Sequence, residues 1–429
     1  MSSYGSSLLR TLRPPQSAAA AALQIRARAA DRETVDPVVM RAPAGNLRPA
    51  SSDSWVGRAR SNACQSEPKD HYVPQAPRSE AMLSALRLVA PGRPLREGLD
   101  RILQAKMGAL IVIGDGPEVL SLCSGGFLLD AEFTPQRLSE LAKMDGAMIL
   151  SSDCTRIARA NVHLVPDPQI ATSETGTRHR TAERVAKQID APVISISEEL
   201  SLVAVHRRGQ KRTLELVGRV LTRADQALQI LERYKARLDA VSGSLSALEI
   251  EDLVTVRDVA TALQRAEMVR RIAEEIEEYV IELGAEGRLI LLQLEELMGG
   301  VEDDRRLFAK DYFVESDGTD VHMVLGVLSQ LDTEVLLDVR EVAEVLGLPR
   351  DTGLDTAVQT RGYRLLHRIP RLPELVADNV VDRFGLLHKI LRASVPDLVE
   401  VEGVGESRAR SIKDGLARLA ESSILERYV

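Results

Sequence analysis

The segment TGTRHRTAERVAKQ, residues 175–188, groups side chains that could bind an anion. Two guanidiniums and an imidazole are adjacent just before a predicted helix: Arg178, His179 and Arg180. Three hydroxyl residues surround them: Thr175, Thr177 and Thr181. Because adjacent like charges repel, the cluster indicates either an anionic partner or a solvated surface loop.

A carboxylate that could hold a divalent cation occurs in MDGAMILSSD, residues 144–153. Asp145 is predicted to lie in a helix-to-strand turn beside Gly146, which would let a ligand approach the backbone closely. Together with the cationic 175–188 segment it matches a metal–nucleotide site, in which the carboxylate holds the cation and the arginines neutralise phosphates. Taken singly, Asp145 is equally compatible with an ordinary turn residue. No GxxxxGK[ST] motif is present, which disfavours a P-loop ATPase.

A second candidate site is GVGESRA, residues 403–409, between two predicted short helices. Gly403 and Gly405 permit a sharp hairpin whose N–H groups face a phosphate at the next helix N-terminus. Three basic residues follow on that helix: Arg408, Arg410 and Lys413. Such contacts read the nucleic-acid backbone and carry no sequence preference. A glycine-capped helical turn without a ligand is the alternative.

The same helix–turn–helix pattern occurs twice near the C-terminus, over residues 369–385 and 395–416. An internal repeat of this kind predicts a paired module, and the second copy resembles the helix-hairpin-helix motif. In the first copy IPRLP, residues 369–373, replaces the Gly-x-Gly, so a weaker hold on phosphate is expected there.

Composition limits the classes of protein that can hold these sites. The 429 residues predict two or three domains, and with only 3% aromatic residues their cores must be aliphatic. A net charge of −8 argues against a protein that coats nucleic acid, but not against a local basic site. Three cysteines without a CxxC pair suit a reducing cytoplasm. The apolar run at 107–114 has the length of a strand, so no membrane span is expected.

The residues that position the first site lie in a predicted α/β domain over 80–220, a mixed sheet with flanking helices. Predicted helices cover 95–108, 134–144 and 182–190. Short apolar or β-branched runs between turns are predicted strands: 109–114, 119–123, 147–152, 156–165, 192–197, 202–208 and 212–217.

Three further regions complete the predicted organisation. Residues 221–345 change to a helical period and predict an all-α spine, broken at GAEGR, residues 284–288. Residues 346–429 contain the paired helical module. Residues 1–79 lack periodicity, and their prolines favour a disordered extension, although the absence of acids from residues 1–30 is also typical of transit peptides.

The motifs DGA, NVHLVPDP and ETGTRHRTAERVAKQ resemble the signature of the diadenylate cyclase (DAC) domain family. The order of cyclase domain, helical spine and helix-hairpin-helix pair over about 80–429 is similar to the multidomain members of that family. The resemblance implies condensation of two ATP molecules into cyclic di-AMP and two pyrophosphates, with Mg²⁺ or Mn²⁺. It also implies a homo-octamer in which paired cyclase domains face each other. Branched or recombination-intermediate DNA would bind the C-terminal module and lower cyclase output in DNA-damage signalling, with the protein at the nucleoid.

The resemblance assigns roles to individual residues. Asp145 would bind the metal and orient the ribose 3′-hydroxyl, while Gly146 and Leu164 would line the nucleoside pocket. The phosphates would be held by Thr177, Arg178, His179, Arg180 and Thr181. Ser197 would touch the γ-phosphate, and His179 would be a phosphate or metal contact. A different class of function stays open: a DNA-junction-binding protein whose α/β domain binds nucleotide without cyclising it.

Overall fold

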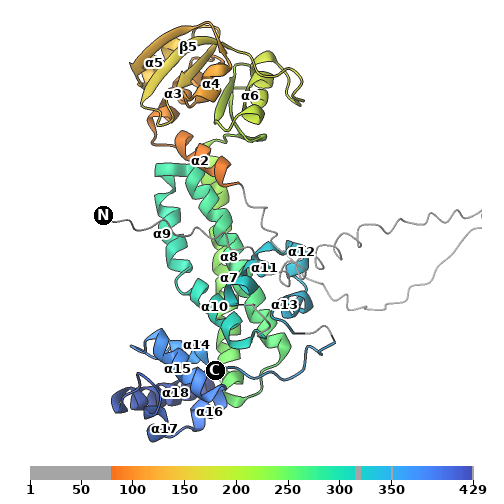
Figure 1. Ribbon diagram of the computed structural model, residues 1–429, viewed down its shortest axis with the longest axis vertical. Coiled ribbons are helices and arrows are strands. Elements are labelled where there is room, and N and C mark those ends of the chain that lie inside the picture. Colours follow the sequence, from red (N-terminus) through yellow and green to blue (C-terminus); the bar gives the residue numbers. More distant parts are fainter. Residues whose placement is uncertain (1–78, 315–319, 349–350, 428–429) are drawn as a thin grey trace, which may run out of the picture. The chain divides into compact units, whose positions relative to one another are not determined.

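The computed structural model describes residues 79–314, 320–348 and 351–427 (Figure 1). The extension expected over 1–79 lies outside these residues except for Ser79, whose Oγ accepts a hydrogen bond from the Met82 backbone N–H and caps the first described helix. The chain divides into two compact units. Of the described residues, one unit contains 79–312 and 353–427, and the other contains 313–314, 320–348 and 351–352.

The α/β domain of the first unit is an eight-stranded mixed sheet in the order β2-β5-β4-β1-β6-β7-β8, with β3 paired to β5. Among the strand pairs of the described residues, β1 and β4 run parallel and the others are antiparallel. The strands are β1 (Ala109–Ile113), β2 (Cys123–Ser124), β3 (Phe127–Glu132), β4 (Ala147–Leu150), β5 (Arg156–Leu164), β6 (Val193–Ser197), β7 (Leu202–Arg207) and β8 (Gln210–Thr213). The expected mixed sheet with flanking helices is therefore confirmed.

Helices cover both faces of this sheet because its central strand is apolar on both sides. Alternate residues of a strand point to opposite faces, so Ile111 joins one buried core cluster and Val112 joins the other. The first cluster includes side chains of α2 (Glu80–Val89), α3 (Pro94–Gln104) and α5 (Pro135–Leu141); the second includes those of α4 (Pro117–Ser121) and α6 (Thr177–Gln188). Helix α5 begins as predicted, with Thr134 as N-cap and Pro135 in the first turn.

Among the strands, local predictions differ from the structure in three places. VLSLC, residues 119–123, is not a strand: it lies mostly in α4 and its last residue opens β2. The predicted strand at 212–217 stops at Thr213, because the following helix begins at Val217. Strand β3 was not expected, since Phe127 and Leu128 are exposed and GFLLDAE lacks the alternating pattern of a half-buried strand. Of the predicted helices, 95–108 ends early, at Gln104, and 182–190 begins early, at Thr177.

The spine helices of this unit are α7 (Val217–Glu251), α8 (Val256–Leu283), α9 (Arg288–Leu297) and α10 (Val301–Tyr312). The predicted break is confirmed, because a 3₁₀ turn at Gly284–Gly287 separates α8 from α9. Ile272 and Ile276 are fully buried, in agreement with the helical period of the sequence.

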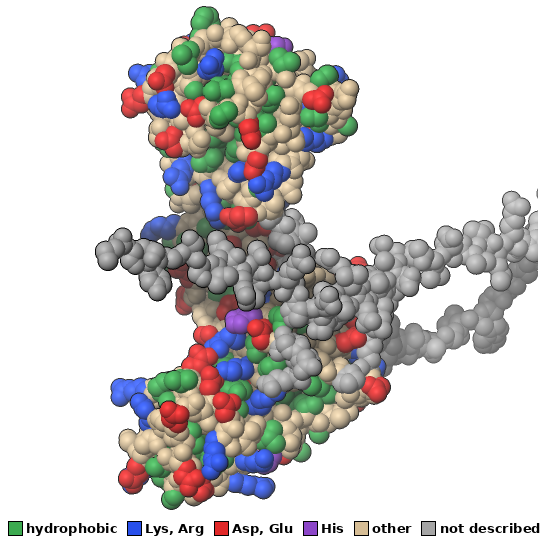
Figure 2. Space-filling view, in the orientation of Figure 1, with side chains coloured by type: hydrophobic (Ala, Val, Ile, Leu, Met, Phe, Trp, Pro, Cys, Tyr) green, Lys and Arg blue, Asp and Glu red, His purple; other side chains and the backbone are tan. Residues whose placement is uncertain are grey.

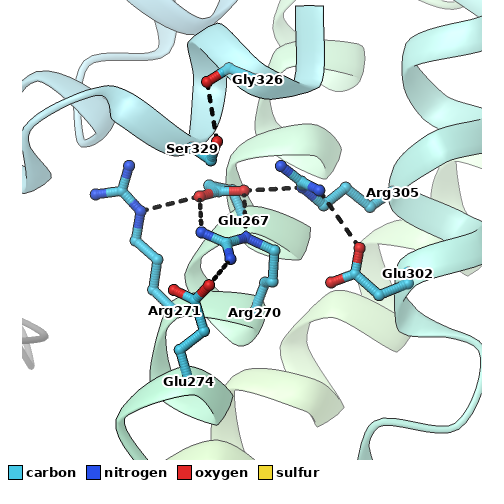
Figure 3. Close-up of polar contacts among 8 residues, drawn as sticks. All are labelled: Glu267, Arg270, Arg271, Glu274, Glu302, Arg305, Gly326 and Ser329. Atoms are coloured by element: carbon cyan, nitrogen blue, oxygen red, sulfur yellow. Dashed lines mark hydrogen bonds and ion pairs between the residues drawn. The ribbon is translucent and has the colours of Figure 1, made fainter. Parts of the chain in front are cut away.

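A buried carboxylate joins α8 to α10. The Glu267 side chain is 0% exposed and receives ion pairs from three arginines (Figure 3): Arg270, Arg271 and Arg305. Glu274 and Glu302 pair with the outer sides of two of these guanidiniums. A buried charge is tolerated only when it is paired in this way, so the network specifies how the two helices pack.

The C-terminal helices are α14 (Tyr363–His367), α15 (Glu374–Phe384), α16 (Leu387–Arg392), α17 (Val395–Val399) and α18 (Glu406–Arg427). Short turns join α14 to α15 and α17 to α18, at the two positions of the predicted repeat. The Asp311 carboxylate of α10 accepts three backbone N–H groups at the start of α14, and the buried Arg364 guanidinium pairs with Glu249 of α7.

The described residues of the second unit form three short helices: α11 (Val321–Gln330), α12 (Thr333–Leu336) and α13 (Val339–Val345). Asp320 and Asp338 cap α11 and α13 by accepting backbone N–H groups. Among the residues that the structure describes, no helix is both long and apolar enough to span a bilayer.

Candidate nucleotide-binding site

The residues predicted to bind a nucleotide gather around one cavity of about 860 Å³ in the α/β domain. Eight of the nine line it: Asp145, Gly146, Leu164, Thr177, Arg178, His179, Thr181 and Ser197. They come from the turn before β4, the end of β5, the start of α6 and the end of β6. The fold thus brings together side chains that are separated by up to two strands and a helix in the sequence. Arg180 is not among the lining residues.

The cationic cluster forms the first turn of α6 rather than a loop before it. The helix begins at Thr177 because Gly176 adopts a φ of +80°, a conformation that glycine reaches without strain. The first N–H groups of a helix lack intrahelical partners and lie at the positive end of its dipole. The turn therefore presents backbone N–H groups together with the side chains of Thr177 and Arg178, an arrangement that suits a phosphate.

Helical geometry separates the two arginines of this turn. Residues two apart on a helix do not share a face, so Arg178 lines the cavity while Nε of Arg180 donates to the Glu174 carbonyl at 3.1 Å. Arg178 lies against the backbone of Gly108, where an added Cβ would be only 2.1 Å from Nη1. Gly108, just before β1, therefore leaves room for the Arg178 guanidinium, although no sequence motif marks it.

Gly146 is required by a neighbouring strand. A Cβ at this position would lie 2.7 Å from Cα of Asn161 in β5, so a side chain would force β4 and β5 apart. This contact gives a reason for the glycine beyond the ligand approach expected from the sequence. The adjacent Asp145 is exposed and faces the cavity.

The cavity has an apolar wall and a charged edge. The wall comes from strands of the sheet, with the buried Leu110, Ala147, Val162, Leu164 and Ala204, and suits a base or ribose. On the charged edge, Lys211 Nζ lies 2.6 Å from Glu174 Oε1. Sequence reasoning missed both of these residues: Glu174 directly precedes the quoted TGTRHR segment, but nothing near Lys211 in the sequence indicates a site.

The His179 ring forms a hydrogen bond with a buried serine. Its Nδ1 lies 3.0 Å from Ser195 Oγ of β6, which in turn lies 3.1 Å from Nε2 of His206 in β7. Burial lowers the pKa of His179, and lowers the pKa of His206 to about 4. Both imidazoles are therefore neutral near pH 7.

The carboxylates of the site fit a metal ion that arrives with a nucleotide. Among the described residues, no group of three or more His, Cys, Asp or Glu side chains is placed to hold an ion by itself. Mg²⁺ commonly uses one or two carboxylates together with substrate phosphates and water. Asp145, in the same cavity as the start of α6, matches that mode of binding.

The second predicted site lies between α17 and α18. Gly403 has a φ of +82°, as a sharp turn requires, whereas Gly405 has open space around it. The cations already have partners: Arg408 donates to the Gly403 carbonyl, Lys413 to the Leu391 carbonyl, and Arg410 pairs with Glu406. Because a carbonyl oxygen carries no formal charge, these hydrogen bonds leave the positive charges of Arg408 and Lys413 in place. Figure 2 shows acidic as well as basic side chains on this part of the molecule.

Two family models match consecutive parts of the chain. A family model described as "DisA bacterial checkpoint controller nucleotide-binding" matches residues 96–211, and one described as "DisA bacterial checkpoint controller linker region" matches residues 214–354. The DNA integrity scanning protein DisA of Frankia casuarinae is 56% identical over 82% of this chain and 99% of its own length. The protein of the same name from Streptomyces coelicolor is 55% identical over 81% of this chain and 94% of its own. The chain belongs to the family of the DNA integrity scanning protein DisA.

Proposed function

We propose that this protein is a diadenylate cyclase that condenses two ATP molecules into cyclic di-3′,5′-adenylate and two pyrophosphates. The observation that carries the proposal is the shared cavity, in which Asp145 and the cationic start of α6 meet beside an apolar wall. A carboxylate for a metal, N–H groups and a guanidinium for phosphates, and an apolar surface for adenosine are the groups that such a substrate needs.

Within one site, the apolar wall with Leu164 and Gly146 holds the nucleoside. Thr177, Arg178, His179 and Thr181 surround the phosphates, and Ser197 contacts the γ-phosphate. Arg180 supports the turn through its bond to the Glu174 carbonyl. Asp145, together with the phosphates, would hold Mg²⁺ or Mn²⁺, and the ion would supply neutralisation of charge on the phosphoryl group.

The chemistry is in-line phosphoryl transfer by positioning, without a covalent enzyme intermediate. The 3′-oxygen of one ATP attacks the α-phosphorus of the other, the bond to pyrophosphate breaks, and the 3′-hydroxyl proton leaves to solvent. Two such transfers close the ring. One cavity holds one half of this symmetric reaction, so two cyclase domains must face each other.

Exposed apolar side chains near the cavity support such pairing. Leu200 and Leu202 line the cavity and are 69% and 43% exposed, and Val165, next to the lining residue Leu164, is 56% exposed. Covering such side chains with a second copy is favourable. We expect a homo-oligomer, an octamer as in the family that the sequence resembles. Specific activity should therefore fall on dilution once light scattering reports monomers; activity that stays constant in the monomer would contradict the pairing.

We also propose that branched DNA binds the turn between α17 and α18 and slows the cyclase. The left-handed Gly403, the start of α18 and the charges of Arg408 and Lys413 support a contact with backbone phosphate. Such binding would place the protein at the nucleoid.

The direct test is to incubate the full-length protein with ATP and Mn²⁺ and to separate the products by chromatography. Cyclic di-AMP and pyrophosphate in a 1:2 ratio are expected. ATP binding by calorimetry without any cyclic product would refute the cyclase and favour the alternative, a DNA-junction-binding protein with a nucleotide-binding domain that does not cyclise.

A further inference from the structure

Behind the cavity lies a chain of three polar side chains that no motif of the sequence marks. His179 of α6 contacts Ser195 of β6, and Ser195 contacts His206 of β7. Ser195 is 0% exposed and His206 is 1% exposed. The antiparallel register pairs Ser195 with Ala204, so His206 is its diagonal neighbour on the same face of the sheet. The contact is thus built into the strand pairing.

The direction of these hydrogen bonds decides which nitrogen of His179 carries the proton. A neutral imidazole has one N–H and one lone pair. The serine hydroxyl has a single proton and two lone pairs. Among the described residues its hydrogen-bond partners are the two rings, and Ser195 is fully buried. If it accepted from both rings, its own O–H would be buried without an acceptor, so it donates to one ring and accepts from the other. Either it donates to His206 and accepts from Nδ1–H of His179, or it accepts from Nε2–H of His206 and donates to Nδ1 of His179.

The far side of His206 distinguishes these two arrangements. Its Nδ1 is buried and has no hydrogen-bond partner among the described residues. In the first arrangement this atom would be a buried N–H without an acceptor, and in the second it is a bare lone pair. Buried N–H groups without a partner are rarer than acceptors that lack one. The second arrangement is therefore favoured, and it leaves the proton of His179 on Nε2.

We propose that Ser195 and His206 are positioning residues that hold His179 as its Nε2–H tautomer, so that it presents a neutral hydrogen-bond donor to a phosphate oxygen in the cavity. The proposal deepens the diadenylate cyclase function and rests on it for the kinetic consequence, but not for the tautomer itself. With Nδ1 engaged by Ser195 and a proton on Nε2, His179 has no lone pair free to act as a base toward the 3′-hydroxyl. A neutral donor also adds no further positive charge beside Arg178.

The tautomer can be measured independently of catalysis. Full-length protein labelled with ¹³C,¹⁵N-histidine contains seven histidines, and the His179 signals are assigned by their loss in His179→Gln. Magic-angle-spinning NMR at pH 7.5 then correlates each ring nitrogen with its neighbouring carbons. We expect a protonated Nε2 and an unprotonated Nδ1. A protonated Nδ1 would overturn the proposal, whether or not the protein proves to be a cyclase.

Kinetics then separates positioning from packing. Ser195→Ala should lower kcat about 10- to 100-fold, as does loss of a residue that hydrogen-bonds to a functional histidine. KM for ATP should stay within about threefold of the wild-type value. His206→Leu should have a similar effect, and His206→Gln should recover most of kcat because its amide N–H can still donate to Ser195. Ser151→Ala is the control, since Ser151 is a buried serine of the same domain outside the cavity.

Two kinetic outcomes would refute the positioning role, and a third would refute the proposed function instead. Equal loss in His206→Gln and His206→Leu would refute the positioning role, because then only the shape of the imidazole matters. Wild-type kcat in Ser195→Ala would refute it as well. If the wild-type protein forms no cyclic product, the proposed function fails while the NMR result still decides the tautomer.

Discussion

The contact between Gly108 and Arg178 allows the side chain of Arg178, which lines the cavity, to be displaced without being mutated. In Gly108→Ala the new Cβ would lie 2.1 Å from Nη1 and 2.7 Å from Cζ of Arg178, whereas ordinary contact begins near 3.4 Å. The guanidinium must therefore move by more than about 1 Å, which is enough to break a well-aligned hydrogen bond. The atoms that must move belong to the end of a flexible side chain, so we expect the fold to persist.

The size of the effect follows from the contact that is lost. A hydrogen bond to a charged group contributes about 1.5–3 kcal/mol. Losing the proposed bond from Arg178 to phosphate should therefore lower kcat/KM for ATP by about 10- to 100-fold. Arg178→Ala should lose at least as much. The assay is initial rate of cyclic product against ATP concentration at saturating Mn²⁺, with the melting temperature as a check on folding.

Gly116→Ala is the matched control, because no atom lies within 4 Å of an added Cβ there and the backbone has an ordinary φ of −70°. It should keep kcat/KM within about twofold of wild type. If Gly108→Ala also keeps wild-type kcat/KM and melting temperature, the position of the Arg178 guanidinium does not determine phosphate binding, and the reasoning from this contact is refuted.

Three further predictions test other parts of the molecule. Asp145→Asn should keep the fold and lower turnover far more than tenfold, because an amide is a poor ligand for the cation; product formation within tenfold of wild type would contradict the metal role. Glu267→Gln should destabilise the unit by about 3–5 kcal/mol, because three arginines lose a buried partner. Glu274→Gln, at a side chain 46% exposed, should cost below about 1 kcal/mol. Hydrogen exchange of α8 amides compares the two variants, and equal protection in both would count against the network. Gly403→Ala should weaken binding of branched DNA, because the φ of +82° at Gly403 suits glycine. Gly405→Ala, where an added Cβ meets open space, should bind the DNA more tightly than Gly403→Ala. The reverse order of affinities in a fluorescence-anisotropy titration would exclude the Gly403 turn as the contact.

The sequence predicted those features that depend on local pattern. The helical period of α8 and the break at residues 284–287 follow from the spacing of apolar residues and glycines, because a helix buries one face at a fixed interval. The start of α5 at Thr134 and Pro135 follows from capping chemistry. Eight residues that line the cavity were also predicted, most of them because they lie in short motifs whose residue types suit phosphate and metal.

Tertiary structure decided which of these residues can act together. Arg178 and Arg180 are equivalent in the sequence, but the early start of α6 turns one into the cavity and ties the other to the Glu174 carbonyl. Strand pairing brings β1, β8 and β7 beside α6 and β6, and this alone places three unpredicted residues near the cavity: Gly108, Lys211 and His206. Hydrogen bonding between strands joins residues that are distant in the chain, and no local period records which strands will pair or in which register.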